Sequence, residues 1–386
     1  MKDNVAISVL LVDGGDRQTI AMAKAYKRLG YIVTTLNDSK LDIGYASRYP
    51  DKKLLFPGSR ADITIRTNAM KECIMTGEYD VIVTTSDDTA EALSLMKKEC
   101  GNKTHIAVVN PDLFYMAYDK NKTMKVCMDN NIPCPKTFFG IEKIEDIPFQ
   151  DITYPVVIKP CMSYGAIGYH RVDTEKELFT LCRSIGSQLS KYVIQEYIPQ
   201  TDIQYECAMF IDQDNCVKSS CVFSKNRWFP INGGSSTCNV TVERPDIVES
   251  CTRLLKALKW KGAADIDLIQ DPRDGKAKIM EINPRVSGSV KIVLNSGVNI
   301  AEQIVQLALG MKVSDYRHYK KDVCLRCIHT DLLWFIKSPN RFKTKPSWFS
   351  WRRTSDQVWM MTDPLPFFAF SLQALVKYKR EMEKRS

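Results

Sequence analysis

The sequence predicts a mixed α/β protein that begins with a Rossmann-like domain. In the first 110 residues, short apolar runs alternate with segments of helical periodicity, a pattern typical of a parallel sheet covered by helices. Beyond Asp119 the spacing changes and short strands predominate. The chain has 386 residues, enough for two or three domains at roughly 100–200 residues each.

The Rossmann-like domain is expected to span residues 1–110. Val5–Val12 is a run of β-branched and aliphatic residues, typical of a buried strand. Apolar residues recur at helical spacing from Thr19 to Leu29, and Gly30 then predicts the end of that helix. The other elements are predicted as strands at 31–36, 79–85 and 105–109 and as helices at 67–75 and 89–99.

Two turns of this domain leave a choice between ligand binding and local structure. Gly14-Gly15 follows the first strand, but the dinucleotide pattern G-x-G-x-x-G is absent, so an ordinary tight turn accounts for it better. Residues 84–88, Thr-Thr-Ser-Asp-Asp, end a later strand. Strand ends at a crevice of such a sheet often contact ligands, but these residues would equally cap the helix predicted after them.

The middle of the chain places a lysine before a glycine-bearing loop. Residues 154–160 are a predicted strand that carries Lys159 near its end, and the loop 161–170 follows. Glycine lets backbone amides approach a phosphate, and lysine supplies a point charge. The Walker A pattern is absent, and the loop alone would also suit an ordinary hairpin. Helices are predicted at 120–130 and from Thr174, and strands at 191–198, 205–211 and 216–223.

The run Glu281-Ile282-Asn283-Pro284-Arg285 predicts oxygen ligands beside a guanidinium. Residues two apart in a strand point to the same side, so Glu281, Asn283 and Arg285 are expected to converge. Carboxylate and amide oxygens suit Mg²⁺, and arginine suits a phosphate or a carboxylate. Asp267, 14 positions before Glu281, would add a second carboxylate.

In this order the motifs resemble those of ATP-grasp enzymes, in the branch similar to the large-subunit domains of carbamoyl phosphate synthetase and to amino-acid ligases. The resemblance covers about Val5 to Leu309. It implies two α+β subdomains that clamp ATP, at 111–190 and 191–315, followed by a C-terminal appendage at 316–386. It also implies ATP and Mg²⁺ as cofactors, with Mn²⁺ as a substitute for Mg²⁺.

The resemblance implies a role for individual residues. Lys120 and Lys159 match two phosphate-contacting lysines, and Arg285 matches the arginine beside the transferred phosphoryl group. The implied metal ligands are Asp267, Glu281 and Asn283. The implied phosphate loop, adenine hinge and ribose contact supply the remaining ATP-binding residues, namely Ser163, Gly165, Gly168, Gln195, Glu196, Tyr197, Ile198 and Asp202.

Three features depart from the family pattern. Asp202 follows Gln200-Thr201 where the family often has Gly and then Glu, which weakens the ribose assignment. Asp267 stands where Glu or Gln is more usual, and Asp265, on the same side of the strand, is an alternative ligand. The phosphate loop has fewer glycines than in many members.

The implied function is an ATP-dependent carboxylate–amine ligase that acts through an acyl phosphate. Its substrates would be small-molecule or glycan-linked carboxylates and amines. Lys225 and Arg227 fall in the region of the acceptor site and are candidate catalytic residues with Arg285; a solvated hairpin is the alternative. Two other functions stay open: phosphorylation of bicarbonate, as in carbamoyl phosphate synthetases and carboxylases, and nucleotide-dependent regulation without catalysis. Family members often pair, so a homodimer is an alternative to a monomer.

The C-terminal segment carries the whole net charge. Residues 317–386 hold 15 Lys+Arg and 6 Asp+Glu, so the net charge of this segment equals the +9 of the full chain. The segment also contains four of the six tryptophans. Basic and aromatic residues together are typical of contact with an anionic membrane, here through residues 334–380. The mixture resembles ATP-grasp proteins of bacterial surface-polysaccharide pathways. The alternatives are an appendage that packs its aromatic residues on the core and another anionic partner; no nucleic-acid-binding motif is evident.

Cysteine usage and hydropathy predict an intracellular location. Thirteen cysteines are spread over the chain, many of them in apolar strands, typical of packing residues in a reducing compartment. Cys324 and Cys327 have metal or redox spacing, but no second pair follows. There is neither an apolar run of the ~18 residues that span a bilayer nor a secretory signal pattern. We expect a cytoplasmic protein, or one bound peripherally to the inner face of the membrane.

Overall fold

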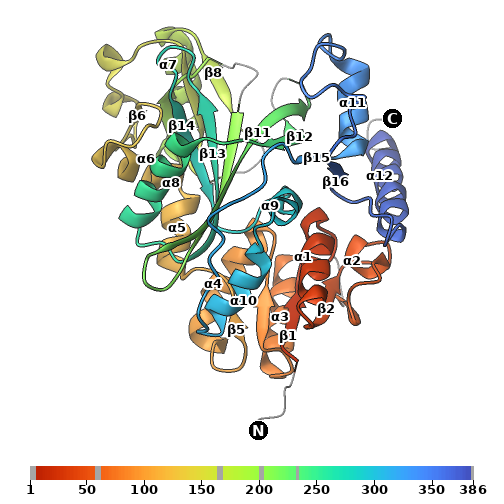
Figure 1. The fold of residues 1–386 in the computed structure, drawn as a ribbon. Helices are drawn as coiled ribbons and strands as arrows, with labels where there is room; N and C mark the ends of the chain where they lie inside the picture. The colour runs from red at the N-terminus through yellow and green to blue at the C-terminus, as the bar shows by residue number, and fades with distance from the viewer. Residues whose placement is uncertain (1–5, 57–61, 163–167, 200–203, 232–233, 384–386) are drawn as a thin grey trace.

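The computed structural model describes residues 6–56, 62–162, 168–199, 204–231 and 234–383, with side chains described as far as Leu375. These residues form three sheets with helices packed between and around them (Figure 1). The mixed α/β fold class predicted from the sequence is confirmed.

The N-terminal domain is a five-stranded parallel sheet in the order β3-β2-β1-β4-β5. Its strands are β1 (Ser8–Leu11), β2 (Ile32–Asn37), β3 (Lys52–Leu55), β4 (Val81–Val83) and β5 (His105–Ile106). Its helices are α1 (Arg17–Arg28), α2 (Ile43–Ala46), α3 (Ile63–Met75) and α4 (Asp87–Cys100). The sequence did not predict β3, an edge strand whose side chains are at most half-buried.

A four-stranded antiparallel sheet, in the order β6-β9-β7-β8, follows further along the chain. It consists of β6 (Thr137–Phe138), β7 (Val156–Pro160), β8 (His170–Val172) and β9 (Tyr192–Glu196), with α7 (Glu175–Ile185) and the 3₁₀ turns at 144–146, 149–151 and 186–191 beside it. The predicted start of α7 is confirmed, because the Thr174 hydroxyl accepts a hydrogen bond from the Glu177 amide.

The largest sheet has seven strands in the order β14-β13-β10-β11-β12-β15-β16. It consists of β10 (Gln204–Ile211), β11 (Val217–Phe229), β12 (Ser235–Thr241), β13 (Gly262–Gln270), β14 (Ala277–Asn283), β15 (Cys324–Arg326) and β16 (Thr354–Asp356). Every neighbouring pair is antiparallel except β15 and β16.

The two faces of this sheet pack against different partners. One face buries Met209, Ile266 and Ile279 in a core shared with α5 (Pro111–Tyr118), α6 (Lys120–Asp129) and α8 (Pro245–Ala257). On the other face, Phe210 and Phe223 join a core that also takes side chains from β1, α1, α9 (Val290–Ser296) and α10 (Ile300–Ala308). This second core fixes the N-terminal sheet against the end of β14, where Arg285 follows.

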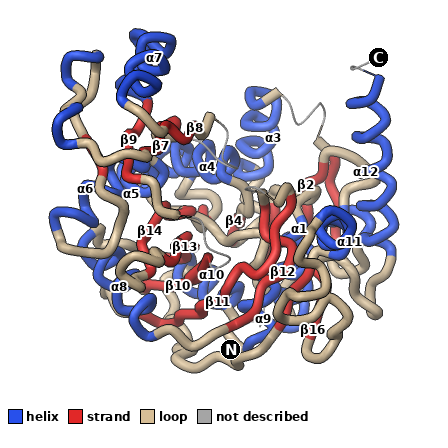
Figure 2. The backbone as a smooth tube through the Cα atoms, turned by 90° about the horizontal axis from the view of Figure 1, so that it is seen from above, coloured by secondary structure: helices blue, strands red, loops and turns tan. Residues whose placement is uncertain are grey.

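The C-terminal segment is attached to the seven-stranded sheet and to the N-terminal domain. Asp331, in α11 (Ile328–Lys337), is fully buried and accepts hydrogen bonds from Arg227 (2.7 Å), Arg326 (2.7 Å) and Thr237 (2.9 Å). The long helix α12 (Leu365–Glu383) packs beside α2, where Gln373 donates to Asp42 at 2.8 Å. Seen from above, α11 and α12 lie together at one side of the molecule (Figure 2).

Candidate active site

One face of the seven-stranded sheet carries a group of polar side chains that we call the site face. Cross-strand partners point to the same side of a sheet. The pairs Glu206–Asp267, Asp267–Glu281 and Asp265–Asn283 therefore place four carboxylates and one amide together, on three adjacent strands. The three predicted metal ligands, Asp267, Glu281 and Asn283, are thus neighbours. Glu206, which was not predicted as a site residue, lies beside them.

A β-bulge in β14 adds a lysine to the site face. The register shifts between Asp267 and Leu268, so that Met280 has no partner on β13. The alternation of side chains is therefore reversed before Glu281: Lys278 points to the site face and Ile279 to the core. Lys278 then forms ion pairs with Glu196 at 2.9 Å and with Asp271 at 2.7 Å.

Two lysines from other elements surround Glu281. Lys120, the first residue of α6, is 5% exposed, and its ammonium lies 3.2 Å from the Glu281 carboxylate. Lys159, on β7, interacts electrostatically with the same carboxylate, and burial lowers the pKa of Lys159 to about 8, with the charge of Lys120 acting in the same direction. Burial alone would raise the pKa of Glu281, but the two lysines hold it below its usual value. The structure thus brings together both predicted phosphate lysines and the central metal ligand.

Lys225 neutralises two further carboxylates of the site face, those of Asp267 and Glu206. From β11 it contacts Asp267 at 2.5 Å and Glu206 at 3.2 Å. Burial raises the pKa of Asp267 to about 6, and the negative charges of Glu206 and Glu281 act in the same direction against the ammonium of Lys225. Burial also raises the pKa of Asp265 well above its usual value. Lys225, predicted as a catalytic residue, therefore lies in the site.

The donor set of the site face fits a hard cation such as Mg²⁺. It consists of carboxylate and amide oxygens, and the Oδ1 atom of Asp265 is buried without a hydrogen-bond partner. Within the described ranges, no three His, Cys, Asp or Glu side chains are arranged around a common metal position. Lys120 and Lys225 instead supply the positive charge beside Glu281 and Asp267. A bound cation would share these carboxylates with the lysines or displace them.

Arg285 connects the site face to the N-terminal domain. Its guanidinium donates to Asp87, the first residue of α4, at 2.7 Å. Buried atoms on both sides of this pair, Nε of Arg285 and Oδ1 of Asp87, have no hydrogen-bond partner. The carboxylate of Asp13, at the end of β1, fixes the loop before α4 by accepting from Thr84 at 2.6 Å and from the Thr85 amide at 2.7 Å. Residues 84–88 thus do more than cap a helix.

The predicted adenine hinge is held by backbone pairing and by its side chains. Gln195 is buried and donates to Thr137 at 2.9 Å. Glu196 forms ion pairs with Lys278 and Arg273, which lower its pKa although burial would raise it. Tyr197 lies under the guanidinium of Arg171, 4.5 Å from the ring centre, and Ile198 is buried. The amides of Glu196 and Tyr197 already donate to Lys136 and Pro155.

Part of the predicted phosphate loop lies outside the described residues. Ser163 and Gly165 of this loop are outside the described residues, and so is Asp202, the predicted ribose contact. Gly168, at the end of the loop, has a φ of +73°, and a β-carbon there would lie 2.9 Å from the ring of Pro160. Glycine is therefore required where the loop turns back onto β7.

The structure places Arg227 away from the site face. A second β-bulge shifts the register of β11 between Lys225 and Arg227, which pair with Asn239 and Cys238 on opposite sides of the sheet. The Arg227 side chain is fully buried and forms an ion pair with Asp331 at 2.7 Å. We therefore assign Arg227 to the attachment of α11 and not to the substrate.

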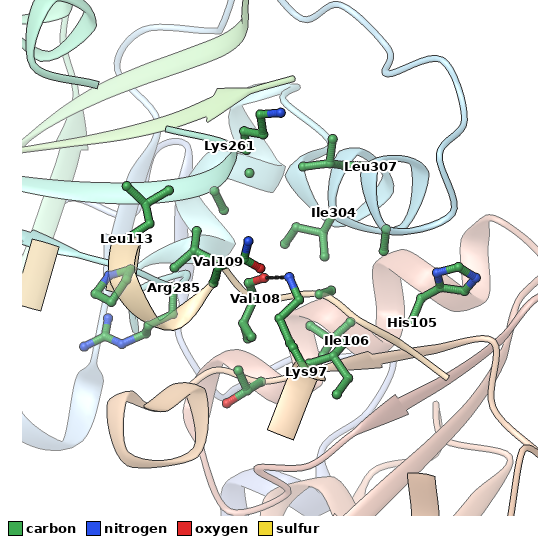
Figure 3. A pocket seen from close by; sticks show the side chains of 18 of the residues that line it. Lys97, His105, Ile106, Val108, Val109, Leu113, Lys261, Arg285, Ile304 and Leu307 are labelled. Atoms are coloured by element: carbon green, nitrogen blue, oxygen red, sulfur yellow. Dashed lines mark hydrogen bonds between the residues drawn. The ribbon is translucent and has the colours of Figure 1, made fainter. Parts of the chain in front are cut away.

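A pocket of about 560 Å³ lies between the N-terminal domain and the seven-stranded sheet, beside Arg285 (Figure 3). Its walls are mostly apolar, and its polar lining includes Lys97, His105 and Lys261 but no acidic residue. Lys97 reaches across the pocket to donate to the Val108 carbonyl at 2.6 Å, and burial lowers its pKa. The pocket combines apolar walls with positive charge, which suits an organic anion.

Several known proteins are similar to this chain in sequence. Residues 117–289 match the model of the ATP-grasp domain family. A D-aspartate ligase of Enterococcus faecium is 25% identical over 248 residues, which cover 58% of this chain and 58% of that protein. A carbamoyl phosphate synthase large chain of Methanocorpusculum labreanum is 24% identical over 339 residues, which cover 84% of this chain and 31% of that protein. The chain thus spans little more than half of one relative and about a third of the other.

The fold is also found in solved structures. A biotin carboxylase–ATP complex from Campylobacter jejuni has a TM-score of 0.68 over 82% of this chain and 74% of that chain, at 16% identity. At this identity the likeness concerns the fold alone. The ATP-grasp fold predicted from the sequence is therefore confirmed. The match to the family model is limited to residues 117–289, and the roles of individual residues stay predictions.

The geometry predicts that replacing Lys225 destabilises the protein in a pH-dependent way. Lys225→Met removes the ammonium that stabilises the charged form of Asp267 at pH 8, which we expect to lower the free energy of unfolding by about 3 kcal/mol. A carboxyl whose pKa is raised on folding adds stability at low pH that is lost as the pH rises past its folded pKa, here about 6. At pH 5 the loss should therefore shrink to about 1 kcal/mol. Urea unfolding at both pH values measures this difference.

Lys218→Met on the same strand is the matched control. Lys218 pairs with Asp212 at 3.1 Å. The pKa of Asp212 is lowered, because hydrogen bonds from two amides and from Lys218 outweigh its burial. Asp212 is therefore charged at pH 5 and at pH 8, and the control should lose the same free energy at both. An equal loss at both pH values for Lys225→Met would contradict the assigned charge state of Asp267.

Proposed function

Because this chain carries an ATP-grasp domain, we propose that the protein is a ligase that uses ATP and Mg²⁺ to join a carboxylate to an amine. The observation that carries the proposal is that Glu281 pairs with Lys120 and interacts electrostatically with Lys159, on one sheet face with Asp267 and Asn283. Residues from all three sheet-containing parts of the structure meet at this site or next to it. Such a meeting of residues is not needed for the packing of any one of these parts. The similarity to a D-aspartate ligase supports the formation of a C–N bond.

The charges of the site suit a polyphosphate. Lys120 and Lys159 would contact the phosphate oxygens of ATP, and Arg285 would hold the phosphoryl group in transfer. Asp267, Glu281 and Asn283 would hold Mg²⁺, which neutralises phosphate charge when it is bound. Lys225 would orient Asp267 and prevent repulsion between Asp267 and Glu206 before the cation arrives.

The proposed reaction has two steps. First, a carboxylate oxygen of the substrate attacks the γ-phosphorus of ATP, the bond from that phosphorus to the β,γ-bridging oxygen breaks, and ADP leaves. The product is an acyl phosphate. Second, the amine nitrogen attacks the acyl carbon, the bond from carbon to the phosphate oxygen breaks, and phosphate leaves while the nitrogen loses a proton. The protein supplies position and charge compensation and forms no covalent bond in either step.

We place the carboxylate substrate in the pocket beside Arg285. The pocket is lined by basic and apolar side chains and by no acidic one, and Arg285 belongs to both the pocket and the site. An organic acid with an apolar body would be held there with its carboxylate toward Arg285. This location lets one residue contact both the substrate carboxylate and the phosphoryl group, as the first step requires.

Two alternatives are tested by the same assay. Bicarbonate could take the place of the carboxylate substrate, in view of the similarity to a carbamoyl phosphate synthase large chain. A regulator without catalysis would bind ATP and release no ADP, but the paired lysines and carboxylates of the site argue against it. A homodimer, a cytoplasmic location and a role in bacterial surface polysaccharides or the cell envelope stay predictions from the sequence.

The test is release of ADP and phosphate by the full-length chain with pairs of amino acids, other organic acids and bicarbonate. With the active pair, Glu281→Gln should lower the rate about 100-fold, because it removes the charge between the two lysines and a metal ligand. The control is Glu249→Gln on the exposed side of α8, with an unchanged rate. If Glu281→Gln released ADP as fast as the unaltered protein, the proposed site would be wrong.

The lowered pKa of Lys159 predicts that ATP binding takes up a proton above pH 8. The free side chain, with a pKa of about 8, is mostly neutral at pH 8.5, and nearby phosphates favour its charged form. Calorimetric titration with ATP in two buffers of different ionisation enthalpy measures the uptake, expected at about half a proton or more. Lys159→Met should abolish this uptake, whereas Lys176→Met on exposed α7 should keep it.

A larger side chain in the pocket is expected to affect the carboxylate substrate and not ATP. Ala308 lines the pocket at the end of α10, and Ala308→Phe should raise the KM for the carboxylate substrate about tenfold, since a benzyl group occupies its space. The KM for ATP should stay within about twofold. The control Ala257→Phe lies at the exposed end of α8 and should change neither constant. A rise in the ATP constant alone would place the carboxylate substrate elsewhere.

A further inference from the structure

The helices α11 and α12 touch near their first residues and carry exposed apolar side chains beyond this contact. The ring of His329 in α11 packs on Phe367 and Phe370 of α12, with centroids 4.6 and 5.0 Å away, and bonds to Ser371 at 2.8 Å. Large apolar side chains further along each helix are exposed.

On α11 the stripe that begins at His329 continues through Leu332, Leu333 and Ile336, which are 46%, 43% and 60% exposed. On α12, Phe368, Leu372 and Leu375 follow one another at spacings of four and three residues and are 58%, 47% and 65% exposed. Isolated exposed leucines are normal on a protein surface, but six large apolar side chains exposed on two helices in contact are typical of an interaction site. We call this group the C-terminal face.

Aromatic side chains extend the C-terminal face into the loop after α11. The rings of Phe342 and Phe349 both contact Phe335, at 5.6 and 5.7 Å, yet they are 70% and 60% exposed. Trp351, in the same loop, is 54% exposed. Exposed aromatic rings that are fixed on one side by neighbouring rings can be inserted into a partner at little loss of side-chain entropy.

The charge of the part of the C-terminal face that comes from α11 and the loop after it has one sign. Residues 332–355 contain six Lys and Arg and no Asp or Glu. Lys337, Lys343 and Arg352 are exposed, and none of them forms an ion pair within the described part of the chain. Asp331, the acidic residue just before this stretch, is buried between two arginines. The partner of the C-terminal face must therefore offer both an apolar interior and negative charge.

We propose that the C-terminal face docks the protein on the surface of a bilayer that contains anionic lipids. Aliphatic and aromatic side chains would enter the boundary between headgroups and acyl chains, and the lysines and arginines would pair with the headgroups. In the described residues no helix is long and apolar enough to cross a membrane, so the contact is peripheral. A second copy of the chain fits less well, because two such faces would bring twelve Lys and Arg together, six from each.

Flotation of the full-length protein with vesicles tests the proposal. We expect binding to phosphatidylcholine vesicles that contain 30% phosphatidylglycerol at 0.05 M salt, and at least tenfold weaker binding to pure phosphatidylcholine or at 0.5 M salt. Lys343→Glu with Arg352→Glu should weaken binding at least tenfold, since each basic residue contributes about 1 kcal/mol near an anionic surface. Ile336→Ser with Leu375→Ser should do the same by removing apolar contacts.

Matched control variants lie on α7, far from the C-terminal face (Figure 1). Lys176→Glu with Arg183→Glu changes charge equally, and Phe179→Ser removes an exposed apolar side chain. Both controls should bind vesicles as the unaltered protein does. Urea unfolding of every variant reports that the remainder of the chain is folded. The proposal itself does not depend on the ligase reaction.

Three results would overturn the proposal. The first is no flotation with anionic vesicles at 0.05 M salt. The second is equal loss of binding by the α7 controls, which would indicate unspecific attraction to net charge. The third is a dimer, measured by light scattering, that Ile336→Ser with Leu375→Ser dissociates while vesicles are not bound; the face would then join two copies of the chain.

Discussion

The structure depends on mutual neutralisation of charges that are held close together away from water. One face of the seven-stranded sheet carries four carboxylates, those of Glu206, Asp265, Asp267 and Glu281. Without nearby cations, their mutual repulsion would destabilise the fold. Lys120, Lys159 and Lys225 arrive from three different elements and make the arrangement stable. The three sheets are therefore positioned around a balance of charge as well as around apolar cores. The same balance makes the site responsive, because a polyphosphate with its cation adds charges of both signs and can redistribute every pair.

Two β-bulges decide which side chains reach this face. The sequence alternation correctly placed Glu281 beside Asn283, but the extra residue Met280 reverses the alternation before it and turns Lys278 toward Glu196. On β11 the opposite happens: Lys225 and Arg227 are two apart, and regular alternation would join them, yet the bulge between them sends Arg227 to Asp331. A bulge leaves the residue types almost unchanged, so neither its position nor its effect on the side chains after it could be predicted from this one sequence.

The predictions that held were those with a local physical cause. Gly30 ends α1, Thr174 begins α7, and the apolar runs became buried strands, because each depends on residues within one or two turns. Motif order then indicated the ATP-grasp fold, which the family comparison confirmed. Contacts between residues far apart in the sequence could not be predicted. Arg285 and Asp87 are 198 positions apart, and only the packing of α1 against α9 and α10 brings the two domains close enough for them to pair.

The seven-stranded sheet also shows that the stretch recognised by sequence motifs is not a physical unit. Its end strands β15 and β16 come from the C-terminal segment and complete a sheet whose other strands carry the site. A chain shortened before β15 would leave β12 as a bare sheet edge with unpaired amides and carbonyls. It would also leave Arg227 as a buried cation without its carboxylate. The C-terminal segment therefore stabilises the sheet that carries the proposed site, and this protein cannot be assembled or dissected as independent modules along its motif boundaries.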